Sequence, residues 1–286
     1  MKKLLVLLLS FILIFCSAAC QETAPNPTDT QTTEATEQKK TPGVFTSREP
    51  VGPPLSYISS AKDYFDVYDF SSPEKEGNLE LLFHQPFRGT DKDYPLIIYL
   101  HGLGEDLSES HLGTSGTMVE TLINLENESD EFSAYTLVPI TPTDATLSWT
   151  SRQYKLLLDL IPYLKENYAI DTKRVYVTGI SMGGFTTCQL VNDLPPETFA
   201  AVIPLSGARN LKQPEAHMDT AFYIHHSTND TVVDVSCARN LYQQLVDCKH
   251  PNAKYVEYPD GTHSSTQYSV FRDRLFYNWL FARHLP

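Results

Sequence analysis

Basic residues are scarce in this sequence of 286 residues. Lysine and arginine together number 22, against 35 aspartates and glutamates, and the formal net charge at neutral pH is −13. Binding to nucleic acid or to anionic lipid depends largely on positive charge on the protein. The composition therefore argues against both nucleic acid and a charged membrane surface as partners.

Cysteines are few, and their spacing shows no pattern. Two of the five, Cys16 and Cys20, lie near the N-terminus, which leaves Cys188, Cys237 and Cys248. Three cysteines cannot all pair within one chain, and no C-x-x-C motif occurs. The sequence therefore indicates neither a disulfide framework nor a zinc site, and we expect no metal and no cofactor.

The hydrophobic run at the N-terminus is too short for a permanent transmembrane helix. It extends from Leu4 to Cys16, about a dozen residues, whereas a bilayer requires about 20. Lys2 and Lys3 precede the run and small residues follow it, which is the layout of a secretory signal. We expect residues 1–19 to direct export and then to be cleaved.

The segment that follows the hydrophobic run suggests a lipid anchor. Ser17-Ala18-Ala19-Cys20 resembles the bacterial lipobox, in which the cysteine is acylated and becomes the new N-terminus. Ser17 stands where that motif usually has leucine, and small residues at these positions also suit ordinary signal peptidase, so plain secretion stays open. Residues 20–49 are rich in Thr, Pro, Gln and Glu, which predicts a flexible tether. Contact with the membrane is expected only through acylated Cys20.

Residues 50–286 are enough for one domain with a substantial core. Apolar runs alternate with helical stretches there, which predicts an α/β fold with a mostly parallel sheet and helices on both faces. The expected strands are Leu96–Leu100, Ala134–Val138, Arg174–Thr178, Ala200–Leu205, Ala221–His225 and Lys254–Tyr258, with Leu79–Phe83 as an antiparallel edge strand. The clearest expected helices are Ser151–Tyr168, Cys237–Val246 and Tyr268–Ala282.

A G-x-S-x-G motif, Gly179-Ile180-Ser181-Met182-Gly183, follows one of these apolar strands and precedes a helix. The chemistry requires glycines there because the serine sits on a tight, strained turn, where a side chain at either glycine would collide with neighbouring backbone. This arrangement is the nucleophile elbow of α/β-hydrolases. It predicts Ser181 as a nucleophile.

A serine hydroxyl becomes a good nucleophile only beside a base, and the base needs a third group that fixes its tautomer. Six histidines follow Ser181, and His263 is the one in a loop after the last expected strand, within the sequence YPDGTH. This fold places its catalytic histidine in that loop. We therefore predict His263 as the base.

Two aspartates follow the expected strand 221–225 and compete for the role of the acid. Asp230 stands at the carboxyl edge of the sheet, where catalytic groups gather in parallel sheets. Asp234 is the alternative, although an aspartate in that position also suits the start of the next helix. We predict that Asp230 orients His263.

An H-G-x-G segment at the end of another apolar strand, in PLIIYLHGLG, predicts the oxyanion hole. In this fold the segment supplies one backbone N–H and the residue after the nucleophile supplies the other. Here these residues are Leu103 and Met182. His101 is expected to hold the loop by hydrogen bonds.

From about Tyr94 onward the chain resembles the esterase and "predicted peptidase" branch of α/β-hydrolases, which includes polyhydroxybutyrate-depolymerase-like and feruloyl-esterase-like enzymes. Six landmarks in order carry the resemblance: PLIIYLHGLGE, DTKRVYVTGISMGGF, FAAVIPLSGA, HHSTNDTVVDVSCARNLYQQL, YPDGTH and NWLFARH. One departure is Ser264-Ser265, since relatives often carry tryptophan shortly after the histidine. Contacts with substrate are expected to differ there.

The resemblance implies an exported serine carboxylic-ester hydrolase that forms an acyl-enzyme intermediate and acts on small-molecule or polysaccharide-linked esters. Residues 206–220 are too few and too polar for the helical cap of many lipases, and an uncapped site suits bulky or polymer-attached esters. Two alternatives stay open. One is a serine peptidase of the prolyl-oligopeptidase type, although the short N-terminal region encodes no gating propeller. The other is an inactive hydrolase-fold module that binds a surface.

Overall fold

The computed structural model describes residues 44–47, 64–87, 92–104, 118–141, 149 and 151–286. Within these residues the strands are β1 (Val44–Ser47), β2 (Asp66–Ser71), β3 (Leu79–His84), β4 (Tyr94–Leu100), β5 (Tyr135–Ile140), β6 (Ile170–Ile180), β7 (Ala201–Leu205), β8 (Ala221–Ser227) and β9 (Ala253–Tyr258). They form one sheet in the order β1-β2-β3-β5-β4-β6-β7-β8-β9. The first three strands and the β3–β5 pair are antiparallel, and the remaining pairs are parallel.

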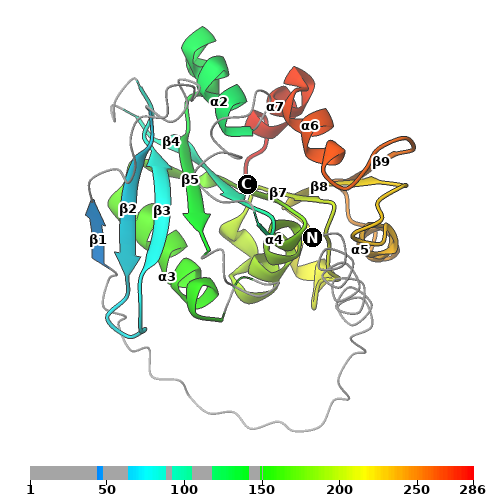
Figure 1. Ribbon diagram of the computed structural model, residues 1–286, viewed down its shortest axis with the longest axis horizontal. Helices are drawn as coiled ribbons and strands as arrows, with labels where there is room; N and C mark the ends of the chain where they lie inside the picture. Colours follow the sequence, from blue (N-terminus) through cyan, green and yellow to red (C-terminus); the bar gives the residue numbers. More distant parts are fainter. Residues whose placement is uncertain (1–43, 48–63, 88–91, 105–117, 142–148, 150) are drawn as a thin grey trace, which may run out of the picture.

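Helices cover both faces of the sheet (Figure 1). One face carries α2 (Met118–Glu128), α6 (Ser265–Phe271) and α7 (Arg274–Phe281), and the other carries α3 (Ser151–Asn167), α4 (Met182–Asp193) and α5 (Ser236–Asp247). Three short 3-10 turns, η2 (Asp130–Phe132), η3 (Pro196–Thr198) and η4 (Pro214–His217), lie in the connections. The expected α/β-hydrolase architecture is therefore confirmed.

The sheet separates two hydrophobic clusters, and alternate side chains of β4 belong to one cluster or the other. Leu96 and Ile98 belong to the cluster under α3, α4 and α5, whereas Ile97 and Tyr99 belong to the cluster under α2, α6 and α7. Successive side chains on a strand point to opposite faces, so a strand covered on both sides buries every residue. Each fully buried isoleucine stabilises the fold by about 1.5–3 kcal/mol relative to an exposed one. This is why β4 reads as an uninterrupted apolar run.

Three elements differ from the expectations. β3 is antiparallel as expected, but it lies inside the sheet because β2 and β1 continue beyond it, and β1 falls within the segment that the composition assigned to the tether. The expected helix 268–282 is two helices. The chain leaves the helical conformation at Asp273, whose carboxylate accepts a hydrogen bond from the N–H of Leu275 and caps α7. In the long connection before β5, α2 packs on the sheet through Val119, Leu122 and Ile123, in which Leu122 and Ile123 follow Val119 at helical spacing.

The order of the strands predicts a ligand site at the carboxyl end of β4. From β4 the chain goes through α2 to β5 on one side and then through α3 to β6 on the other. A ligand site in an α/β sheet lies where the strand order reverses in this way.

Between β7 and β8, residues 206–220 form only a loop and η4, so no cap domain lies there. No helix in the described ranges has the length and apolar character needed to cross a bilayer.

Candidate active site

Ser181 lies on a strained turn between β6 and α4. Its backbone angles, φ 54° and ψ −117°, are ones that a residue with a side chain rarely adopts. The strained turn is held in place because the Ser181 N–H donates to the carbonyl of Leu205 at 2.9 Å, and the Ser181 carbonyl accepts from the N–H of Phe185 at 3.0 Å. The side chain of Ser181 makes no capping hydrogen bond to the helix. The hydroxyl is therefore not used by the helix that it precedes.

Gly179, Gly183 and Gly207 allow β4 and the loop after β7 to approach this turn. A Cβ at Gly183 would collide with the carbonyl oxygen of Leu100, and a Cβ at Gly207 would collide with the carbonyl oxygen of Ser181. A Cβ at Gly179 would lie 2.6 Å from the carbonyl group of Gly183. Close contact between backbones brings the ends of β4, β6 and β7 together around Ser181.

Gly183→Ala is expected to destabilise the domain by at least about 3 kcal/mol, because backbone rather than a flexible side chain would have to move. Urea unfolding followed by circular dichroism measures this loss. Gly104→Ala is the control. A Cβ at Gly104 meets nothing within 4 Å, although its φ of +77° still costs about 1–2 kcal/mol. Equal losses in the two variants would contradict the steric explanation.

The loop after β4 is held by His101, whose side chain is buried. Its Nδ1 lies 2.8 Å from the carbonyl oxygen of Gly102, and its Nε2 accepts from the N–H of Thr141 at 3.0 Å. Nδ1 therefore carries the proton and donates it to Gly102. The peptide is trans, so the N–H of Leu103 points away from the Gly102 carbonyl. The expected role of His101 in holding the loop agrees with these bonds.

The two predicted oxyanion donors follow neighbouring strands. Leu100 at the end of β4 is in register with Gly179 of β6, so the loop with Leu103 lies beside the turn with Ser181. Met182 is the first residue of α4, and N–H groups in the first turn of a helix have no partner within it. The positive end of the helix dipole favours negative charge at the same place. Both N–H groups thus lie at the edge of the sheet where Ser181 stands.

Asp230 and His263 meet across the loops that follow β8 and β9. His263 Nδ1 lies 2.7 Å from Asp230 Oδ2, and Asp230 Oδ1 accepts from the N–H groups of Val232 and Val233, both at 2.9 Å. Burial alone would raise the pKa of the Asp230 carboxyl, but hydrogen bonds from His226, His263 and Val233 hold its pKa well below the usual range. Asp230 is therefore an anion at neutral pH and can orient a histidine.

The loop that carries His263 rests on buried hydroxyl groups. Ser206 Oγ donates to the carbonyl oxygen of His263 at 3.0 Å. Thr266 Oγ1 lies 2.9 Å from Ser206 Oγ and 2.7 Å from Ser227 Oγ. All three hydroxyl-bearing residues are fully buried. This hydroxyl cluster joins the loop after β7 and the end of β8 to the start of α6, and Ser206 connects it to His263.

The segment Leu205–Gly207 contacts both Ser181 and the loop of His263, and so holds the two residues near each other. Leu205 accepts from the N–H of Ser181, Ser206 donates to His263, and Gly207 lies against the backbone of Ser181. Within the described part of the chain no hydrogen bond joins the hydroxyl of Ser181 to the His263 ring. Such bonds are often long in unliganded enzymes and shorten when substrate binds.

The competing residues lie in different surroundings. Asp234, the alternative acid, is exposed and accepts a hydrogen bond from the N–H of Ser236 at 2.8 Å, at the start of α5. His225 is buried, and burial lowers its pKa to about 3, so it stays neutral. Its Nδ1 bonds to the hydroxyl of Tyr258. Trp149, which precedes the expected helix Ser151–Tyr168, packs in the core beside the His101 ring. Cys20 and the signal segment lie outside the described residues.

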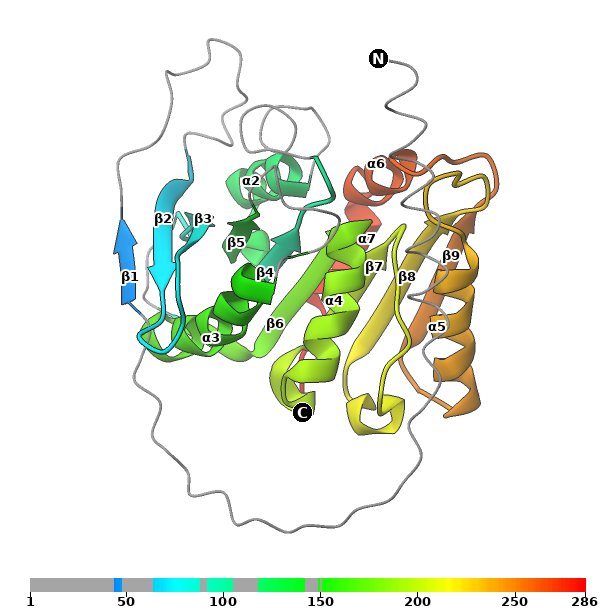
Figure 2. The ribbon, with the colours of Figure 1, turned by 60° about the horizontal axis from the view of Figure 1, so that its bottom comes forward.

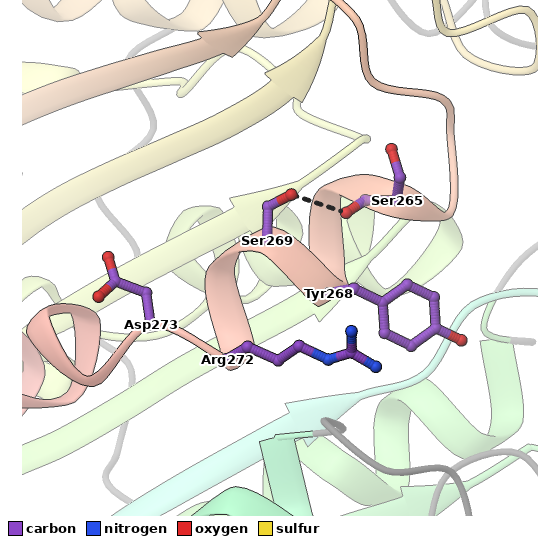
Figure 3. Close-up of a pocket in the computed structure, with 5 residues that line it drawn as sticks. All are labelled: Ser265, Tyr268, Ser269, Arg272 and Asp273. Carbon is purple, nitrogen blue, oxygen red and sulfur yellow. Dashed lines mark hydrogen bonds between the residues drawn. The ribbon is translucent and has the colours of Figure 1, made fainter.

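A surface cavity of about 390 Å³ lies on α6, which begins two residues after His263 (Figure 3). The described lining residues are Ser265, Tyr268, Ser269, Arg272 and Asp273, and no predicted site residue is among them. Figure 3 shows the Arg272 side chain beside the Tyr268 ring, and the Ser269 hydroxyl bonded to the carbonyl of Ser265. Figure 2 shows α6 at the same end of the sheet as the loops after β7 and β8.

The structure adds residues that the motifs did not reveal. Ser206 and Thr266 hold the histidine loop, and His226 lies 3.1 Å from Asp230 Oδ2. The signal for His226 was its position four residues before Asp230, near the carboxyl end of the strand. Serines and threonines in loops carry no comparable signal, because their partners come from distant parts of the chain.

The strand order, the strained serine turn between β6 and α4 and the aspartate–histidine pair after β8 and β9 are those of the α/β-hydrolase fold. The model of the phospholipase/carboxylesterase family matches residues 132–273. This range includes the serine turn and both members of the aspartate–histidine pair.

Two curated proteins are similar to part of this chain in sequence. A bifunctional acetylxylan esterase/xylanase of Neocallimastix patriciarum is 30% identical over 161 residues, which are 54% of this chain and 22% of the relative. A poly(3-hydroxyalkanoate) depolymerase of Paucimonas lemoignei is 25% identical over 159 residues, which are 54% of this chain and 37% of the relative. The chain thus spans well under half the length of either. The crystal structure of a thermostable esterase is similar with a TM-score of 0.67 and 25% identity, covering 78% of this chain and 64% of that chain.

Proposed function

We propose that this protein hydrolyses carboxylic esters, with Ser181 as nucleophile, His263 as base and Asp230 as the group that orients the base. The observation that carries the proposal is the bond of 2.7 Å between His263 Nδ1 and a buried, ionised Asp230, beside a serine on a strained turn. That bond leaves Nε2 of His263 as the nitrogen that accepts a proton.

In the proposed mechanism His263 Nε2 takes the proton of the Ser181 hydroxyl while Oγ attacks the ester carbonyl carbon. The carbonyl oxygen becomes an anion and accepts from the N–H groups of Leu103 and Met182. His263 then gives its proton to the leaving alcohol, which departs and leaves an acyl group on Ser181. Water attacks this acyl-enzyme by the same route and releases the acid. No metal or cofactor is required for these steps.

The proposed substrates are esters attached to a polymer or to a bulky alcohol, and acetylated or feruloylated polysaccharide is the first choice. The loop between β7 and β8 carries no cap, so the approach to Ser181 from that side lacks the cover that a long acyl chain requires. The two sequence relatives act, by name, on acetylxylan and on a hydroxyalkanoate polymer. Both substrates are esters of large molecules.

The test is a panel of acetylated xylan, feruloyl esters, short-chain aryl esters and peptide amides, assayed with the purified domain. We expect turnover of aryl esters and faster turnover of at least one polymer-linked ester than of any peptide amide. Peptide amides as the preferred substrates would indicate the peptidase alternative. The absence of all turnover, together with no labelling by an organophosphonate, would indicate the inactive binding module.

We further propose that residues 1–19 direct export, that acylated Cys20 anchors the mature chain, and that residues 20–49 tether a catalytic domain spanning residues 50–286. Two features of the sequence support this arrangement: the lipobox-like Ser17–Cys20 and the polar composition of the segment after it. A net charge of −13 offers no electrostatic attraction to anionic lipid, so acyl chains would supply the membrane affinity.

Cys20→Ala is expected to move the protein from the membrane fraction to the soluble fraction, or to block its maturation. The physical reason is that a diacyl group buries apolar area at about 0.8 kcal/mol per methylene. Fractionation and mass spectrometry of the N-terminal peptide after expression in a bacterium measure the change. Cys188→Ala is the control, since Cys188 is a buried free thiol in the folded domain. Wild-type protein in the medium with an unmodified N-terminus would favour plain secretion.

A further inference from the structure

His226 is a second histidine that reaches the carboxylate of Asp230. Its side chain is fully buried, and its Nε2 lies 3.1 Å from Asp230 Oδ2 and 3.1 Å from the carbonyl oxygen of Val233. A carbonyl oxygen and an ionised carboxylate oxygen can only accept hydrogen bonds. The proton of His226 is therefore on Nε2, and it is shared between the two acceptors.

The other ring nitrogen explains why His226 acts as a neutral donor. His226 Nδ1 is buried and has no hydrogen-bond partner in the part of the chain that the structure describes. A second proton there would create a buried charge and an unpaired N–H, both of which are costly. The ring thus has one fixed tautomer and points its only N–H at Asp230 and Val233.

This N–H completes the surroundings of the carboxylate. Asp230 Oδ1 accepts from two backbone N–H groups, and Oδ2 accepts from both His226 and His263. A rotation that moved Oδ2 away from His263 would also break its bond to His226. The negative charge on Oδ2 is shared between two donors, so His263 experiences only part of it.

We propose that His226 is a positioning residue, which holds Oδ2 of Asp230 in place for His263 and limits the attraction of the carboxylate for protonated His263. Its effect on rate rests on the proposed function, whereas its effect on the titration of His263 does not. Without His226, Oδ2 would hold the protonated ring more strongly. The base would then lose its proton only at higher pH. Asp234, another ionisable group near His226, bonds to the N–H of Ser236 and would be unchanged.

The neighbouring residue on β8 provides a matched control. His225 is also buried, but its Nδ1 bonds to the Tyr258 hydroxyl, and adjacent residues on a strand point to opposite faces. His226→Phe removes the donor, and His226→Gln keeps an N–H donor of similar reach. His225→Phe removes a buried imidazole of the same size with no bond to Asp230. All three substitutions preserve most of the buried volume.

Two measurements separate positioning from stability. One is the pH dependence of kcat/KM for an aryl ester. The other is the titration of the His263 ring by NMR in protein with labelled histidine, with the signal assigned by its loss in His263→Gln. The NMR titration requires no turnover. If the wild-type protein hydrolyses no ester, the proposed function fails, and the NMR titration still decides the role of His226.

For His226→Phe we expect kcat to fall about tenfold. This is the lower end of the loss that follows when a residue that orients a functional side chain is removed. The acid limb of the rate profile and the NMR titration should both move to higher pH. His226→Gln should stay close to wild type, and His225→Phe should shift neither the rate profile nor the NMR titration.

An unmoved His263 titration in folded His226→Phe would overturn the proposal, as would an equal shift in His225→Phe. If His226→Phe does not fold, His226→Asn replaces it, because its shorter side chain does not reach Oδ2. An unmoved titration in that variant overturns the proposal equally.

Discussion

Ser181→Ala is expected to abolish ester hydrolysis and to leave the fold intact. The substitution removes one hydroxyl from a partly exposed turn, and that hydroxyl makes no capping bond to α4. The turn is held by backbone hydrogen bonds to Leu205 and Phe185, which the variant keeps. Loss of the nucleophile of a catalytic triad typically lowers turnover by a factor of about 10⁴ to 10⁶.

The measurement is kcat on an aryl ester, together with labelling by an organophosphonate and identification of the modified peptide. Ser269→Ala is the matched control, because it removes a single hydroxyl from α6 that donates to the carbonyl of Ser265 within the same helix. It should keep turnover within about twofold of wild type, as expected of a surface substitution. Turnover near wild type in Ser181→Ala, or a label on another residue, would place the nucleophile elsewhere.

Asp230→Asn is expected to lower turnover by about 10³- to 10⁴-fold, because an amide favours the wrong tautomer of His263. The physical basis is that Asp230 accepts the proton of His263 Nδ1 on a buried, ionised oxygen. Asp234→Asn should preserve most of the turnover. Asp234 is exposed and accepts from Ser236 at the start of α5, so its loss should cost about 1 kcal/mol of stability.

The ratio of the two kcat values on one ester is the measurement that assigns the acid. Asp230 accepts four hydrogen bonds, so its replacement is also expected to lower stability by about 1–3 kcal/mol. Circular dichroism and thermal unfolding of both variants must therefore show a folded protein at the assay temperature. If Asp234→Asn were the more damaged enzyme, the assignment of Asp230 would be wrong, while the assignments of Ser181 and His263 would not be affected.

Most of the parallel strands were predictable because they are buried on both faces and read as apolar runs, and all six expected segments lie within or overlap strands of the sheet. The break between α6 and α7 was not predictable from hydrophobic pattern. Apolar residues recur at helical spacing on both sides of it, as in Phe271 and Leu275, and the break falls where the Asp273 carboxylate caps α7. The place of β3 inside the sheet depends on its pairing with β2 and β5, which a single sequence does not reveal.

The sequence by itself nominated the candidate positions, because each follows an expected strand and parallel strands bring such positions to one edge. Ser181, Asp230 and His263 could be nominated in this way, and so could Leu103 and Met182. The tertiary structure decided which groups meet there. The choice of Asp230 over Asp234 depends on a bond between loops 33 residues apart in the chain. The support of His263 by Ser206 spans 57 residues, and local pattern carries no information about pairing at that distance.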